Sequence, residues 1–161
     1  MRMRPFILIG LLVTAVVAAP LKFSSRENRT HLIELYGSEG CSSCPPAERW
    51  LGELRTNPGL WHDFVPVAFH VIYWDHLGWR DRFARKEFTA RQYAYSSQWS
   101  SDTVYTPGFV LDGEEWRRTS GQHPPQASPE KAGTLSVEYA ADGGCQVWRA
   151  KAWRGSRWRS G

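Results

Sequence analysis

Two cysteines separated by two serines are followed at once by two prolines, and this order limits the local fold more than any other feature. The stretch Gly40-Cys41-Ser42-Ser43-Cys44-Pro45 comes after an apolar run over residues 31–36 that predicts a strand. Proline is tolerated in the first turn of a helix, where an N–H group has no intrahelical partner. Apolar residues then recur at helical spacing until Asn57-Pro58-Gly59. The sequence therefore predicts a strand-to-helix junction with the cysteines at the helix N-terminus.

This position gives the two cysteines different chemistry. Unpaired N–H groups and the positive end of the helix dipole favour a thiolate, so Cys41 is the predicted nucleophile. Cys44, one turn inward, is the predicted resolving cysteine, which closes on a mixed disulfide and releases the partner. Zinc usually needs four ligands, and the chain has no second cysteine pair to complete them. Neither a metal site nor an organic cofactor is predicted for this exchange chemistry.

Two alternatives to redox chemistry remain open at this level. An exported protein also uses a close cysteine pair as a disulfide that only stabilises the fold. A soft ion such as copper(I) is the other alternative, with His70 or His76 completing the site. Cys145 is the third cysteine, and we expect it to be buried or unpaired, or to form an intermolecular disulfide.

The remaining pattern predicts an α/β fold with a mixed central sheet flanked by helices. Residues 65–73 are nearly continuously apolar, as in a strand covered on both faces, and residues 81–99 predict a second helix. Asp112-Gly113 separates apolar residues 104–111 from residues 115–119 and predicts a hairpin. The proline-rich residues 121–133 predict a connector, and a second hairpin is predicted over residues 135–150. This order indicates a βαβ crossover completed by a hairpin.

Two features resemble the thioredoxin-like superfamily. One is the Cys-Ser-Ser-Cys stretch at a strand-to-helix junction, and the other is Thr106-Pro107 directly before an apolar strand and hairpin. In that superfamily the corresponding proline is cis and lies beside the cysteine pair. The resemblance therefore implies that Pro107 shapes a substrate groove and that the main chain of Thr106 contacts the substrate.

A closer resemblance is to the exported bacterial family called domain of unknown function 1223. It is carried by residues 34–47, 69–79, 88–92 and 104–107, and it spans about residues 31–120. The family is thioredoxin-like and usually exported, without an established reaction or substrate. Residues 121–161 fit the family less well. We therefore expect a thioredoxin-like domain over residues 30–120 and a divergent C-terminal extension over residues 121–161, consistent with a truncated or replaced end.

Further site residues are predicted from their position beside the cysteines. In thioredoxins a buried carboxylate under the cysteine pair accepts a proton six residues before the first cysteine, whereas Glu34 lies seven before Cys41. One residue of offset reverses the face of a strand. Glu34 is therefore either a proton relay or a buried polar residue with a backbone partner.

The loop after the second strand should meet the cysteine loop, because parallel neighbours deliver their C-terminal loops to one sheet edge. Trp74, Asp75 and His76 are therefore predicted to line the substrate groove. On the second helix, Arg91 and Gln92 either fix this loop by hydrogen bonds or lie on a solvated face.

The N-terminus predicts export. Arg2 and Arg4 precede an uncharged apolar run over residues 6–19, which is typical of a signal peptide over residues 1–19, with an uncleaved anchor as the alternative. The predicted location is the periplasm or the cell exterior, where a disulfide persists. After removal of the signal we expect no stable membrane insertion.

The net charge of +4 does not indicate a nucleic-acid partner. All 16 acidic residues lie between Glu27 and Asp142. Once the basic residues of the two ends are set aside, 13 basic residues remain against these 16 acidic ones, so the body of the chain is mildly acidic. The residues set aside are Arg2, Arg4, Arg149, Lys151, Arg154, Arg157 and Arg159. The sequence thus predicts an exported thiol-disulfide oxidoreductase, with protein or small-molecule thiols and disulfides as partners.

Overall fold

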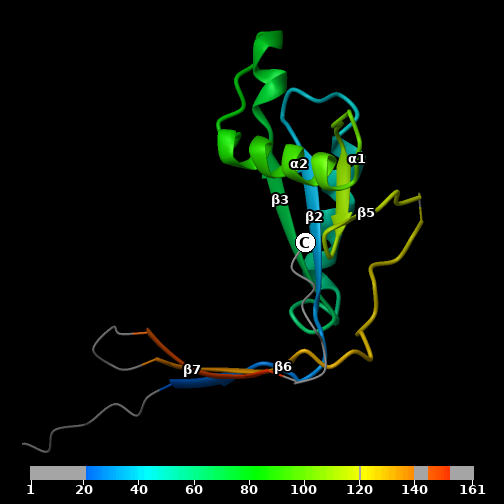
Figure 1. The fold of residues 1–161 in the computed structure, drawn as a ribbon. Coiled ribbons are helices and arrows are strands. Elements are labelled where there is room, and N and C mark those ends of the chain that lie inside the picture. Colours follow the sequence, from blue (N-terminus) through cyan, green and yellow to red (C-terminus); the bar gives the residue numbers. More distant parts are fainter. Residues whose placement is uncertain (1–20, 120, 140–144, 153–161) are drawn as a thin grey trace, which may run out of the picture.

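The computed structural model describes residues 21–119, 121–139 and 145–152, which form two sheets and two main helices (Figure 1). A four-stranded sheet has the order β3-β2-β4-β5, and a three-stranded sheet has the order β1-β6-β7. The strands are β1 (Leu21–Ser24), β2 (His31–Gly37), β3 (Phe64–His70), β4 (Gly108–Leu111), β5 (Glu114–Glu115), β6 (Gly133–Tyr139) and β7 (Cys145–Ala152). The helices are α1 (Pro45–Glu53) and α2 (Lys86–Gln98), with 3-10 segments η1 (Leu54–Thr56) and η2 (Ile72–Leu77).

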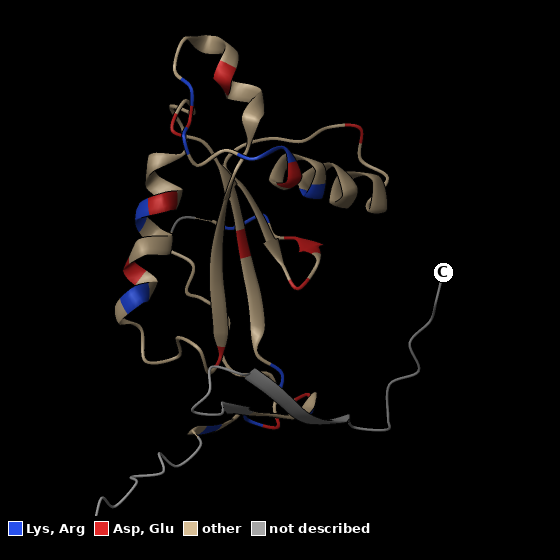
Figure 2. Ribbon diagram, turned by 90° about the vertical axis from the view of Figure 1, so that its left-hand side faces the viewer, with Lys and Arg blue, Asp and Glu red and all other residues tan. Residues whose placement is uncertain are grey.

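The four-stranded sheet is mixed, as the sequence predicts. The central strand β2 runs parallel to β3 and antiparallel to β4. The helices α1 and α2 lie on opposite sides of this sheet (Figure 2). Ile33 and Leu35 point toward α1 and pack in one core cluster with Ala47 and Phe109, whereas Tyr36 belongs to the cluster on the α2 side. Alternation along β2 therefore supplies both cores.

The expected second strand is shorter and less buried than its apolar sequence indicates. It ends at His70 instead of residue 73, and the next residues form η2. Among the described strands β3 is an edge of the sheet, and Ala68 on it is exposed. Pro66 fits this edge position, because proline cannot donate to a neighbouring strand. The prediction of a strand covered on both faces is therefore wrong.

The second helix begins five residues later than expected, at Lys86 rather than residue 81. Asp81 lies in a turn before the helix, where its Oδ1 accepts a hydrogen bond of 2.8 Å from the N–H of Phe83. Aspartate side chains compete with helical hydrogen bonding in this way. The delay thus has a local cause that helical periodicity does not reveal.

Both predicted hairpins form. Asp112 and Gly113 have φ angles of 54° and 93°, the left-handed conformations that a tight two-residue turn between β4 and β5 requires. Strand β6 pairs with β7 and, on its other side, with β1. The predicted signal peptide and the side chain of Cys145 lie outside the described residues. No helix among the described residues has the length and apolarity to cross a membrane.

Glu34 is the charged group buried most deeply in the main sheet. Its side chain is 1% exposed and lies on the α2 face, where it receives two hydrogen bonds of 2.8 Å from the guanidinium of Arg91. The hydroxyls of Tyr36 and Tyr95 also donate to it, at 2.7 and 2.8 Å. Burial by itself raises the pKa of Glu34, but these hydrogen bonds more than offset it and hold the pKa below its usual 4.5.

Replacing Glu34 by glutamine should destabilise the fold by about 1–3 kcal/mol at neutral pH, because the four hydrogen bonds from three residues lose a charged acceptor. The folded-state pKa of Glu34 is the lower one, so its contribution is complete above about pH 4.5 and is lost as the pH falls through the folded value. Urea unfolding of both proteins from about pH 7 to about pH 3 should show the difference shrinking in acid. A constant difference would contradict this account, and the exposed Glu114→Gln variant is the matched control.

Candidate functional site

The cysteine pair lies where β2 gives way to α1, as predicted. Cys41 and Cys44 form a disulfide, and both are buried, with 2% and 0% of their surface exposed. Ser42 and Ser43 between them are exposed. The backbone carbonyl of Cys44 accepts hydrogen bonds from the N–H groups of Ala47 and Glu48, so Cys44 is the N-cap residue of α1, and Cys41 lies in the turn just before the helix. In this oxidised state the serines, and not the sulfurs, face the solvent.

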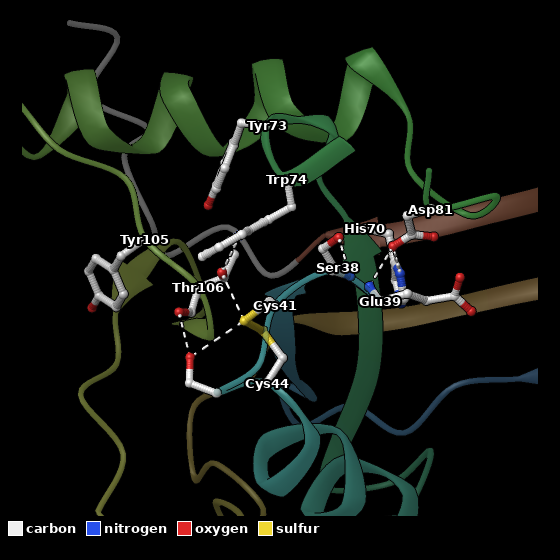
Figure 3. Close-up of a disulfide and its surroundings, with 12 residues drawn as sticks. Ser38, Glu39, Cys41, Cys44, His70, Tyr73, Trp74, Asp81, Tyr105 and Thr106 are labelled. Carbon is white, nitrogen blue, oxygen red and sulfur yellow. Dashed lines mark hydrogen bonds and ion pairs between the residues drawn. A yellow bond between two sulfur atoms is a disulfide. The ribbon is translucent and has the colours of Figure 1, made fainter. Parts of the chain in front are cut away.

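The hydroxyl of Thr106 forms a hydrogen bond with the sulfur of Cys41 (Figure 3). Its Oγ1 accepts a hydrogen bond of 2.8 Å from Nε1 of Trp74 and donates one of 3.2 Å to Sγ of Cys41. An indole N–H only donates, so the hydroxyl proton is free to point at the sulfur. The structure thus brings together Cys41, Thr106 and Trp74, which the sequence predicts separately.

The peptide bond between Thr106 and Pro107 is cis, as the resemblance to the thioredoxin-like superfamily implies. Pro107 is followed by Gly108, where an added Cβ would lie 2.8 Å from the carbonyl oxygen of Tyr105. Only glycine fits this close approach. The backbone around Pro107 is therefore packed tightly against the turn that precedes it.

A buried glutamine fixes the segment that carries Thr106. Gln92 on α2 donates from Nε2 to the carbonyl oxygen of Tyr105 at 2.8 Å and accepts a hydrogen bond of 3.2 Å from the hydroxyl of Tyr73. Of the two alternatives for Gln92, the structure shows the first: the residue is buried, and its bond to Tyr73 reaches the loop after the second strand. Arg91, its neighbour, turns instead to Glu34.

Three other predicted residues are not brought to the sulfurs. Asp75 uses Oδ1 to accept the N–H of Asp81 at 3.1 Å, and the exposed His76 has no contact with the pair among the described residues. Glu34 lies on the α2 face, whereas α1 packs on the other face. No contact among the described residues joins Glu34 to either cysteine, and its role as a proton relay stays a prediction.

A buried aspartate anchors the loop that enters the cysteine pair, and sequence reasoning missed it. The fully buried side chain of Asp81 accepts hydrogen bonds from the N–H of Glu39 at 2.8 Å and from Nδ1 of His70 at 2.6 Å. Burial by itself raises the pKa of Asp81, but the bonds from Glu39, His70 and Phe83 outweigh it and lower the pKa. Asp81 lies in a stretch that reads as helix, so no local signal marked it.

A groove of about 470 Å³ opens beside the pair, between α1 and the segment after β5. On its wall the guanidinium of Arg118 stacks on Trp50, 4.1 Å from the ring centre. The lining is apolar and cationic, with one acidic residue, and consists of Ser43, Pro46, Ala47, Arg49, Trp50, Glu53, Pro107, Phe109, Arg118 and Gly121. Among the described residues no group of three or more His, Cys, Asp or Glu is placed to hold a metal ion.

The candidate site lies in the part of the chain that matches a known protein family. The model of a family described as "Protein of unknown function (DUF1223)" matches residues 32–142. The match continues past residue 120, where the sequence resemblance was expected to end, and includes β6. The crystal structure of protein AGR_C_4864 from Agrobacterium tumefaciens is 40% identical over 54% of this chain and 37% of that one, with a TM-score of 0.47. This chain therefore spans well under half the length of that protein. No curated protein matches it.

Replacing Asp81 by alanine should loosen the loop before Cys41, because the amides of Glu39 and Phe83 lose their acceptor. Hydrogen exchange of these two amides should accelerate by a factor on the order of 5 or more, while the amide of Val110 in the core is unaffected. Unchanged exchange at Glu39 would contradict the anchoring role. The exposed Asp102, replaced in the same way, is the control.

Proposed function

The chain belongs to the family described as protein of unknown function DUF1223, and we propose that it is an exported, thioredoxin-like protein that performs thiol-disulfide exchange. The single observation that carries the proposal is the Cys41–Cys44 disulfide at the start of α1, with the hydroxyl of Thr106 donating to the Cys41 sulfur. A disulfide with only a structural role needs no hydrogen-bond donor on one of its sulfurs. A donor in that position stabilises a thiolate when the disulfide is reduced.

Three further features support the thioredoxin-like part of the proposal. The parallel strands β2 and β3 are connected through α1, and the hairpin β4–β5 joins the same sheet next to β2. The cis peptide bond at Pro107 lies directly before β4. The side chain of Thr106, at the same bond, reaches the cysteine pair. The crossover, the hairpin and the cis proline are the elements that the resemblance implies, and the side-chain contact of Thr106 is added by this chain.

The reaction uses the two cysteines in sequence. The Cys41 thiolate attacks one sulfur of a partner disulfide, which forms a mixed disulfide and releases the first partner thiolate. Cys44, as thiolate, then attacks Sγ of Cys41, restores the Cys41–Cys44 disulfide and releases the second partner thiolate. Two electrons pass from the cysteine pair to the partner disulfide, and each released thiolate takes up a proton. The reverse sequence oxidises a partner dithiol.

The groove is the proposed binding surface for the partner. It begins at Ser43 and Pro107, next to the buried sulfurs, and continues along the aromatic wall of Trp50 and Phe109. A protein or small-molecule thiol with an apolar group beside its sulfur fits this lining. The basic and apolar residues 2–19 support an exported protein that works in the oxidising periplasm or cell exterior.

A trapping experiment tests the exchange. In a Cys145→Ser background, the Cys44→Ser variant forms a mixed disulfide at Cys41 that is not resolved, and mass spectrometry of an extract should identify the attached partners. The matched Cys41→Ser variant should trap none of them. An absence of mixed disulfides through Cys41, with the disulfide of the parent protein resisting dithiothreitol, would overturn the proposal in favour of a structural disulfide.

Thr106→Val tests the role of the hydroxyl, because valine keeps the shape of threonine and removes the donor to the sulfur. Alkylation of Cys41 in the reduced protein should slow by about tenfold near neutral pH, since a hydrogen bond to a charged sulfur is lost. The rates are measured with iodoacetamide across pH, in the Cys145→Ser background. Thr103→Val is the control, and equal rates for Thr106→Val and the parent would contradict the assigned role.

A further inference from the structure

A carboxylate oxygen is buried at the start of α1 without a hydrogen-bond partner. Oε1 of Glu48 exposes less than 1 Å² and accepts no hydrogen bond from the described residues. The backbone N–H of Glu48 is satisfied by the carbonyl of Cys44, so the unpaired atom belongs to the side chain. Leaving a buried polar atom unpaired costs about 1–3 kcal/mol. An unpaired buried acceptor in a native protein therefore calls for a specific explanation.

The unpaired oxygen and the sulfur of Cys44 both border the same position, the α-carbon of Gly37. Glu48 follows Cys44 by four residues, and this spacing puts both side chains on one face of the helix. Both also border Gly37 at the end of β2, where an added Cβ would lie 3.4 Å from Oε1 of Glu48 and 3.6 Å from Sγ of Cys44. Because Gly37 has no side chain, the space shared by the carboxylate and the sulfur stays open on the β2 side.

The other ionisable groups on neighbouring elements are occupied elsewhere. Glu34 on β2 faces the opposite side of the sheet and is paired with Arg91. His70 on β3 is opposite Gly37 in the strand register, and its Nδ1 is bound to Asp81. Arg49 and Glu53 on α1 are exposed and line the groove. Among the described residues, Glu48 is thus the carboxylate placed to exchange a proton with Cys44.

We propose that Glu48 accepts the proton of the Cys44 thiol when Cys44 resolves the mixed disulfide at Cys41. The inference deepens the proposed exchange function and rests on it. The carboxylate of Glu48 takes the proton, the S–S bond between Cys41 and the partner breaks, and the Cys41–Cys44 bond forms. The departing partner thiolate then takes the proton from Glu48 or from solvent. In the reverse reaction, Glu48 as the acid protonates Cys44 as it leaves the disulfide.

The test follows the two steps separately in reduced protein carrying Cys145→Ser. Dithiobisnitrobenzoate releases one coloured thiolate when Cys41 attacks it and a second when Cys44 resolves the mixed disulfide. Glu48→Gln should leave the first release unchanged and slow the second by about tenfold or more near neutral pH. The difference should disappear in alkaline solution, where hydroxide deprotonates Cys44 directly. Glu87→Gln, the same change in the first turn of α2, should behave as the parent.

A second variant reaches the same step without removing the carboxylate. The Cβ of Gly37→Ala would make ordinary van der Waals contacts, so the fold should accept it, but it would touch both the carboxylate oxygen and the sulfur and crowd the space that they share. The second release should slow in this variant too. A second release in Glu48→Gln with the rate and pH dependence of the parent overturns the role of Glu48 alone. Failure of the parent to give the first release overturns the exchange function itself.

Discussion

The alternation of side chains along β2 is the constraint on which the described structure depends. This strand lies between β3 and β4, and its two faces are covered by α1 and α2, so no residue can change places with its neighbour. Ile33 and Leu35 anchor the core under α1, and the next residue in each case faces α2. The same strand delivers Gly37 and the cysteine loop to α1. A shift of one residue would therefore exchange both cores and misplace the cysteine pair.

The signals that predicted the fold correctly are local ones. Pro45 and Pro46 mark the start of a helix through their own backbone restrictions, and Asp112-Gly113 marks a turn through its left-handed conformation. The position of β3 at an edge of the sheet cannot be predicted from its own residues, because it depends on which strands lie beside it. Its apolar residues predicted full cover, and only Pro66 hinted at an open edge. The predicted end of the domain at residue 120 likewise comes from the family resemblance and does not follow from the residues around it.

The candidate site shows the same division. The cysteine pair and Thr106-Pro107 were predicted from motifs, and the structure joins them with Trp74. Glu34 lies one residue away from the spacing of the thioredoxin carboxylate, and the structure shows its side chain on the α2 face, which is the reversal that this offset predicts. Asp81 and Glu48 have no motif of their own, and their importance arises from burial and from partners, or the lack of one, that only the folded chain supplies.

The hydrogen bonds from Trp74 to Thr106 and from Thr106 to Cys41 contain no group that titrates near neutral pH apart from the sulfur itself. A histidine in the same place would gain or lose its charge close to pH 6.5 and would change the electrostatic environment of the sulfur with it. An indole and a hydroxyl keep the same donor strength in acidic and neutral surroundings. The hydrogen bond that reaches the Cys41 sulfur is therefore the same in acidic and in neutral solution, and any change in reactivity with pH has to come from the sulfurs themselves or from groups outside these two hydrogen bonds.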